Sequence, residues 1–167
     1  MPTLMEPLRN EHAALVPHID ALRTTADLVG VAPAEELRAL ADESFEFLVH
    51  HLIPHATAEE EVLYPAVERA MGTPGATATM SRDHVAVDRL THELGQLRSR
   101  LAGAEGVPDE LARGLRRVLY GLYALVMVHF AKEEEIYVPL LEAHLTAGQA
   151  AELLGRMEAA AGAAPGH

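Results

Sequence analysis

A stretch of fourteen residues occurs twice in the chain and strongly restricts how the chain can fold. Residues 55–68 read HATAEEEVLYPAVE and residues 129–142 read HFAKEEEIYVPLLE, with six identical positions. In each copy a histidine is followed by a glutamate four residues later and by a proline ten residues later. Residues four apart share one face of an α-helix. The repeat therefore predicts two equivalent helices, each with a His–Glu pair on one face.

The rest of the chain has the composition of a helical domain. It contains 167 residues, enough for one domain with a core, and aromatic residues make up only 4%. Leu, Ala, Glu and Arg, which favour helices, are abundant, whereas β-branched residues are sparse. Turn signals rich in Gly and Pro separate four segments with helical periodicity, at residues 3–29, 34–71, 77–102 and 109–145.

Four long helices with short connections predict an all-α fold, an antiparallel up-down four-helix bundle. His12 and His84 are 72 residues apart, close to the 74 residues between His55 and His129, so the bundle is expected to be a duplicated helical hairpin. Thr146 is a candidate N-cap for a short C-terminal fifth helix. We expect a bundle domain over residues 1–145, with the short helix and a flexible tail over residues 146–167.

Charge and cysteine content exclude several classes of function. The chain has no cysteine, which rules out disulfides, iron–sulfur clusters and cysteine-ligated zinc. Its net charge of −12 argues against binding to nucleic acid. The longest apolar stretch, VLYGLYALVMVHFA, is too short to span a bilayer, and the N-terminal residues do not resemble a signal peptide. We therefore expect a cytoplasmic protein without a membrane partner.

The repeated His–Glu pairs lie within apolar stripes. On a helical wheel Glu59 falls beside His55, and Glu133 beside His129, whereas the other glutamates of each triplet point away and are expected to be solvated. The residues expected to share these two faces are Leu48, His51, Leu52, Val62 and Ala66 around His55, and Leu122, Leu125, Val126, Ile136 and Leu140 around His129.

A buried carboxylate is costly unless it is paired or bound to a metal ion. A single pair of this kind is more simply explained as a buried His–Glu hydrogen bond. Two pairs at matching heights, together with two further histidines, favour a metal centre held by nitrogen and oxygen. Such donors suit iron, and also zinc or manganese.

The other two helices contribute further candidates. On the first helix His12 has the more apolar face and is preferred over His18, although Pro17 could kink the helix. On the third helix, His84 and Asp88 repeat the His–acid spacing at the edge of the apolar stripe, where an exposed pair is an equal alternative.

Two further features leave alternatives open. His51, one turn before His55, is an extra ligand, a hydrogen-bond donor behind the ligands, or a gate. Pro54, Pro65 and Pro139 are expected to bend their helices, or to mark a fray or break.

The motifs resemble those of the hemerythrin-like (HHE cation-binding) family. The resemblance rests on Glu11–His12, HATAEEEVLYP at 55–65, Asp83–His84 and HFAKEEEIYVP at 129–139, and covers about residues 5–142. It implies a non-haem centre of two Fe ions, oxo- or hydroxo-bridged and with carboxylate bridges, for which the donor chemistry allows Zn or Mn as substitutes. The ligands that it implies are His12, His55, Glu59, His84, His129 and Glu133.

Oxygen-carrying members of the family have a further histidine where this chain has Asp88. That difference argues against simple reversible oxygen carriage. The main hypothesis is a di-iron protein that binds O₂, peroxide or NO for sensing or detoxification. The alternatives are a di-iron enzyme that turns over peroxide or NO and, less favoured, a metal-free bundle that acts through protein partners. The oligomeric state and the redox partner stay open.

Overall fold

The computed structural model describes residues 3–164, so part of the predicted flexible tail, residues 165–167, lies outside the described residues together with residues 1–2. The described residues form five helical rods and no strand. The first rod is α1 (Glu6–Leu28), the third is α5 (Ala78–Ala102), and the fifth is α8 (Ala147–Ala163). The second rod joins α2 (Ala34–Phe47), η1 (Leu48–Leu52), α3 (Ile53–Ala58), η2 (Glu59–Leu63) and α4 (Tyr64–Met71), and the fourth joins α6 (Asp109–Lys132), η3 (Glu133–Tyr137) and α7 (Val138–His144).

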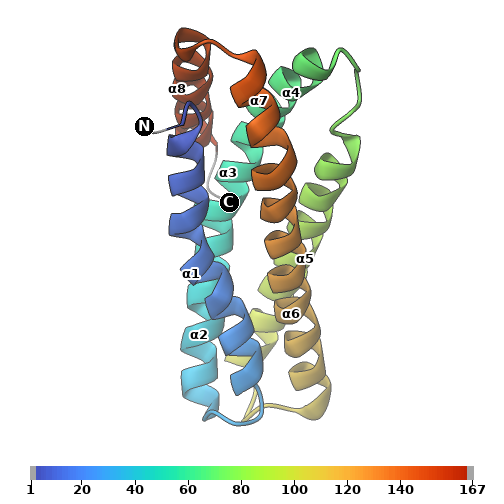
Figure 1. Ribbon diagram of the computed structural model, residues 1–167. Coiled ribbons are helices and arrows are strands. Elements are labelled where there is room, and N and C mark those ends of the chain that lie inside the picture. Colours follow the sequence, from blue (N-terminus) through green and yellow to red (C-terminus); the bar gives the residue numbers. More distant parts are fainter. Residues whose placement is uncertain (1–2, 165–167) are drawn as a thin grey trace.

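The first four rods form the predicted antiparallel up-down bundle. Each rod packs against the next one along the chain, and α6 packs back against α1, which closes the bundle. The connections lie at alternate ends of the molecule (Figure 1). Gly72 ends the second rod in the left-handed conformation, with φ +64°, a conformation that glycine adopts without a steric penalty.

The fifth helix begins where the sequence predicted. The Thr146 hydroxyl accepts a hydrogen bond from the Gln149 backbone N–H, and the Gln149 side chain bonds back to the Thr146 N–H, forming a capping box. The helix is 17 residues long, so it is longer than the short helix expected. It packs against α3 and η2 of the second rod, and it contributes Ala150, Leu153 and Met157 to the core.

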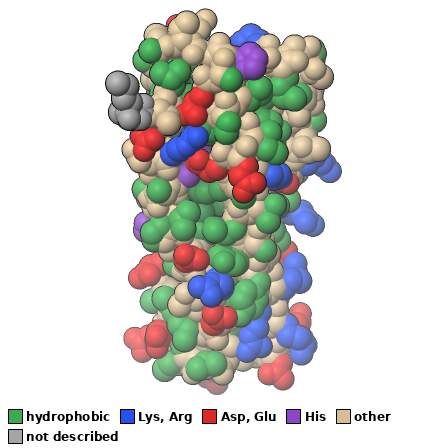
Figure 2. Space-filling model, in the orientation of Figure 1, with side chains coloured by type: hydrophobic (Ala, Val, Ile, Leu, Met, Phe, Trp, Pro, Cys, Tyr) green, Lys and Arg blue, Asp and Glu red, His purple; other side chains and the backbone are tan. Residues whose placement is uncertain are grey.

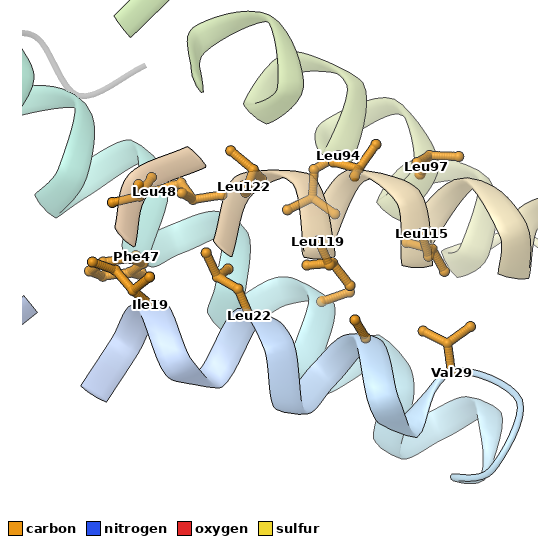
Figure 3. Close-up of a cluster of buried hydrophobic side chains, with 14 of the residues drawn as sticks. Ile19, Leu22, Val29, Phe47, Leu48, Leu94, Leu97, Leu115, Leu119 and Leu122 are labelled. Atoms are coloured by element: carbon orange, nitrogen blue, oxygen red, sulfur yellow. The ribbon is translucent and has the colours of Figure 1, made fainter. Parts of the chain in front are cut away.

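The apolar core consists of two separate clusters. The larger one fills the end of the bundle where residues 29–33 and 103–108 make the connections; it includes Ile19, Leu48, Leu94 and Leu122 (Figure 3). The smaller one fills the other end and includes Leu8, Leu63, Met80 and Leu141. The repeated histidines and glutamates lie where the contributions of their rods change from the larger cluster, which ends at Leu52 and Phe130, to the smaller one, which begins at Ala58 and Tyr137, so a polar layer lies between two apolar layers.

The second and fourth rods contain three widened, π-helical turns, each just before a proline. The N–H of the residue preceding the proline donates to the carbonyl five residues back: Ile53 to Leu48, Tyr64 to Glu59, and Val138 to Glu133. The proline that follows has no N–H, so no backbone donor is left unpaired at the proline when the turn before it is wider. The prolines therefore neither fray nor break these rods.

The turn η3 also corrects one predicted core position. Ile136 is 57% exposed, although a regular wheel places it beside His129. Tyr137 and Val138 are buried instead. A π-helical turn holds about one residue more than an α-helical turn, so every later side chain is rotated relative to a regular α-helical wheel.

Candidate metal centre

Four histidines, one from each rod of the bundle, meet in the polar layer. His12 comes from α1, His55 from α3, His84 from α5 and His129 from α6. His12, His55 and His129 are each 3% exposed, and the His84 side chain is 12% exposed. On the face shown in Figure 2, histidine surface is scarce among apolar and charged side chains. The structure therefore brings together all four histidines that the sequence singled out.

Glu59 and Glu133 lie among these rings and are fully buried, with 0% exposure. Their donor atoms form a first group with two histidines. Glu59 Oε1 lies 2.8 Å from His55 Nε2 and 3.6 Å from His12 Nε2, and Glu133 Oε2 lies 3.6 Å from His12 Nε2. One ligand atom from each of the four residues lies within 4.8 Å of the others, a spacing that could hold a metal ion.

A second group uses the other oxygen of the same glutamate. Glu59 Oε2 lies 3.1 Å from His84 Nε2 and 3.8 Å from His129 Nε2, and the two Nε2 atoms are 3.0 Å apart. These three residues also satisfy the spacing for a metal ion. Glu59 thus faces one group with each oxygen.

Hydrogen bonds on the outer side of the rings determine what the inner atoms can do. His84 Nδ1 is 2.7 Å from Glu60 Oε1, and His129 Nδ1 is 3.0 Å from Asp83 Oδ2. Carboxylates only accept, so each Nδ1 carries the proton and each neutral ring presents a lone pair at Nε2. Two such lone pairs 3.0 Å apart repel each other unless a proton or a metal ion lies between them.

Five inner atoms of the two groups lack hydrogen-bond partners among the described residues. These buried atoms are His12 Nε2, His55 Nε2, both oxygens of Glu59, and Glu133 Oε2. The 2.8 Å approach of His55 Nε2 to Glu59 Oε1 does not have hydrogen-bond geometry. Each unsatisfied buried group costs about 1–3 kcal/mol. Converging atoms without partners are the arrangement expected of ligands to a shared cation, so the donor set fits metal ions.

The closeness of these buried groups shifts the pKa values of both glutamates and of His129. Burial would raise the pKa of Glu59, but the charge of His55 and the closeness of the other histidines hold it well below its usual value. Burial and the charge of Glu59 raise the pKa of Glu133. Burial would lower the pKa of His129, yet the nearby carboxylates of Glu133 and Glu59 raise it to about 10. Protons thus compete for the positions that cations would take.

Two glutamates that the sequence placed in solvent belong to the site. Glu60 binds His84 Nδ1, and Glu134 Oε1 lies 2.6 Å from His12 Nδ1. The expectation was wrong because a side chain that points off the central stripe of its own helix can still reach a ring on the adjacent helix. Only Glu61 and Glu135, the last glutamate of each triplet, are exposed as expected.

Tyr64 is a functional candidate that the sequence reasoning missed. Its residue is 2% exposed, and its hydroxyl donates to Glu133 Oε1 at 2.9 Å. The Tyr64 hydroxyl oxygen also lies 3.2 Å from His129 Nε2 and 3.3 Å from His84 Nε2. Burial raises the pKa of Tyr64, so the phenol stays protonated. The sequence signal that could have identified Tyr64 is its position within the repeated motif, between the three glutamates and the proline.

Other candidates lie away from the two groups. Asp88 is exposed and belongs to neither group of donor atoms. His51 is exposed and stacks on Phe47, with ring centroids 6.2 Å apart. His18 is exposed and stacks on the same ring, so the choice of the His12 face agrees with the structure.

These features define a helical-bundle protein with a buried histidine–carboxylate centre able to bind metal ions. The chain matches the family described as Hemerythrin HHE cation binding domain over residues 3–141, and it belongs to that family. The resemblance drawn from the motifs is confirmed. No curated protein and no solved structure matches the chain significantly. Among the described helices, none has the length and apolar character needed to cross a membrane.

Proposed function

We propose that the protein holds two iron ions and binds O₂, peroxide or NO at them, for sensing or for removal of these molecules. The observation that carries the proposal is the position of Glu59. One of its oxygens faces His12 and His55, and the other faces His84 and His129. A single buried carboxylate shared by two donor groups is suited to two cations, since it can offer one oxygen to each.

The chemical nature of the donors favours iron. Imidazole and carboxylate suit iron, zinc or manganese, and the site contains no thiolate. Iron would supply one-electron chemistry and an affinity for O₂, peroxide and NO that zinc lacks. The apolar layers on both sides keep bulk water away from the donors, and the Tyr64 hydroxyl provides a hydrogen-bond donor among them.

The two groups have different numbers of donors. The first has His12, His55, Glu59 and Glu133, whereas the second has Glu59, His84 and His129. Asp88, at the position of the family's further histidine, is exposed. The second group is therefore the better candidate for leaving a coordination position to an exogenous ligand.

A small surface groove is lined by His84, one of the two histidines of the second group. It has a volume of about 330 Å³ and is lined by Glu60, Ser81, His84 and Asp88 together with apolar residues of α3 and α5. His84 is also the most exposed of the four rings. A groove of this volume can admit a diatomic molecule or peroxide as far as the His84 side chain, which supports ligand access on this side.

Metal content and optical absorption test the proposal directly. We expect two irons per chain after anaerobic loading, with absorption bands that change on addition of peroxide, NO or azide. The matched control is zinc-loaded protein, which should show no such bands. Failure of the chain to retain iron would overturn the proposal.

An enzymatic role at the same centre is the second candidate. The Tyr64 hydroxyl, which lies beside two rings and donates to Glu133, favours it because a fixed hydrogen-bond donor at the centre can stabilise negative charge that develops on a reacting oxygen. Steady-state consumption of peroxide or NO beyond one equivalent per centre would support turnover over simple binding. A metal-free role is disfavoured by the five unpartnered inner atoms.

A further inference from the structure

All four histidines of the centre are held from behind by a carboxylate of a neighbouring rod. In every case the ring's Nδ1 is the atom bound, which leaves Nε2 facing the centre. The pairs are His12 with Glu134 at 2.6 Å, His55 with Glu11 at 2.9 Å, His84 with Glu60 at 2.7 Å, and His129 with Asp83 at 3.0 Å.

The pairs follow a closed path around the bundle. The first rod supplies Glu11 to the second, the second supplies Glu60 to the third, the third supplies Asp83 to the fourth, and the fourth supplies Glu134 to the first. Each acid is also next in sequence to a residue of the centre: Glu11 to His12, Glu60 to Glu59, Asp83 to His84, and Glu134 to Glu133. Every rod thus offers an inner donor and, from the adjacent residue, a support for the following rod.

We propose that Glu11, Glu60, Asp83 and Glu134 form a ring of positioning residues that prepares the four imidazoles to bind metal. This inference rests on the proposed function and concerns how its metal site is built. A carboxylate accepts but does not donate, so it selects the tautomer with the proton on Nδ1 and the lone pair on Nε2. It also orients the ring and raises its basicity as a ligand.

The four supporting carboxylates fall into two pairs, one for each group of donor atoms. Glu134 and Glu11 support His12 and His55, the two histidines of the first group. Glu60 and Asp83 support those of the second group, His84 and His129. Loss of one pair of acids should therefore weaken one metal position more than the other.

Three of the four acids are themselves held in place. Glu60 Oε2 accepts a hydrogen bond from Ser81 at 2.8 Å, Asp83 accepts one from Lys132, and Glu134 Oε2 lies 3.7 Å from Arg9 Nε. Glu11 has a side chain that is 48% exposed. Glu11 should consequently be the weakest support, because an exposed carboxylate is hydrated and less restricted.

Single isosteric substitutions with matched controls test the ring. Glu60→Gln and Glu134→Gln replace a supporting carboxylate by a neutral amide that can donate as well as accept, whereas Glu61→Gln and Glu135→Gln remove the same charge from an exposed neighbour. We expect about 10- to 100-fold weaker binding of Fe(II), under anaerobic conditions, and of Zn(II) in the first two variants. The two controls should stay within about threefold of the unaltered protein.

Double variants test the division by position. Glu60→Gln/Asp83→Asn and Glu11→Gln/Glu134→Gln should each retain one tightly bound zinc ion, and the fourfold variant should retain none. In the zinc-loaded protein, ¹⁵N chemical shifts of the imidazoles should report protonated Nδ1, with the shifts altered only at the rings that have lost a support.

The outcomes separate the two proposals. Failure of the unaltered protein to take up two ions would overturn the proposed function, and the role of the ring with it. If the unaltered protein takes up two ions normally, and the Glu60 and Glu134 variants bind metal as tightly as the controls, the positioning role of the four carboxylates would be overturned while the proposed function would stand. If the four carboxylates had only a structural role, the variants would show a lower melting temperature without metal and an unchanged metal affinity. That result would also overturn the positioning role.

Discussion

At the scale of single residues, Glu59 determines whether the two donor groups form one centre. It is the only residue common to the two groups found among the described residues. It is also fully buried in the polar layer. Its negative charge is what makes the approach of several imidazoles favourable, since burial alone would favour the neutral acid.

Substitution of Glu59 should therefore affect both metal positions at once. We predict that Glu59→Gln lowers the metal content from two ions per chain to fewer than one, because the amide keeps the size but not the charge of the shared ligand. Elemental analysis after anaerobic loading measures this. Glu61→Gln is the control, and equal metal content in both variants would contradict the prediction.

Tyr64 should contribute to stability through one hydrogen bond. We predict that Tyr64→Phe lowers the free energy of unfolding of the metal-free protein by about 1–3 kcal/mol, because it leaves a buried oxygen of Glu133 without its donor. Urea unfolding measures the change. Tyr137→Phe is the matched control, because Tyr137 is also buried but its hydroxyl has no hydrogen bond among the described residues. An equal loss in both variants would argue against the specific bond.

At the scale of elements, the repeat in the sequence corresponds to a repeat in backbone geometry. The turns η2 and η3 begin at Glu59 and Glu133, the two buried glutamates, and each precedes a proline. The carbonyl of each glutamate accepts the bond that closes the wide turn. The glutamate side chain is thus placed at the start of a turn whose shape the proline favours by removing the competing donor.

The C-terminal helix α8 covers the segment that carries His55 and Glu59. It lies outside the residues matched by the family, 3–141, yet it packs on α3 and η2. It completes the smaller apolar cluster beside the polar layer. In this chain, therefore, an element outside the matched region helps to close the centre.

The capping box of α8 gives a prediction at this scale. We predict that Thr146→Ala lowers the free energy of unfolding by about 1 kcal/mol, since it removes the oxygen that accepts the Gln149 N–H. Thr24→Ala is the control, because its hydroxyl bonds only to a carbonyl within α1 and the residue is exposed. Chemical denaturation should show no more than about 0.5 kcal/mol for the control.

At the scale of the whole molecule, the bundle consists of two apolar layers that enclose a charged layer. The apolar clusters stabilise the fold, whereas the polar layer carries the repulsion between lone pairs and the unpartnered oxygens. Without metal, bound protons are what reduce this repulsion. The stability of the metal-free protein should therefore depend strongly on pH.

The pKa shifts give the direction of this dependence. The pKa of His129 is raised from its ordinary value of 6.5 to about 10, so its contribution to stability is complete below pH 6.5 and is lost as the pH rises towards 10. The raised pKa of Glu133 acts in the same direction above its ordinary value of 4.5. The lowered pKa of Glu59 contributes stability above pH 4.5 that is lost in acid.

We therefore predict that the melting temperature of the metal-free protein is highest between about pH 5 and 6.5 and falls as the pH is raised to 9. In the metal-loaded protein, metal retention should instead increase as the pH is raised, because imidazoles bind metal only when neutral. Calorimetry of both forms from pH 5 to 9 checks this, and a metal-free melting temperature that rises above pH 6.5 would contradict it.

The spacing of residues along the chain was enough to predict which side chains of the candidate site face the interior. Periodicity placed His12, His55 and His129 on inner faces, and it placed Glu59 and Glu133 beside them. These predictions succeeded because residues four apart on a helix share a face whatever the partner helices are. The N-cap at Thr146 was predictable for the same reason, since capping depends on residues three positions apart.

The same spacing failed where backbone geometry or a second helix decided the outcome. Ile136 was misplaced because the wheel assumes regular α-helical turns, and η3 is wider. Glu60 and Glu134 were assigned to solvent because a wheel describes one helix at a time. Their partners, His84 and His12, belong to other helices.

The sequence by itself therefore determined the helices, the bundle and the inward direction of the His–Glu pairs, because these depend on local periodicity and on burial of an apolar stripe. Only the tertiary structure decided which carboxylate supports which imidazole, that Glu59 faces both groups, and that the Tyr64 hydroxyl lies beside two rings. Those contacts depend on the relative heights and rotations of separate helices. Packing of the whole bundle sets these relations, and no short-range pattern encodes them.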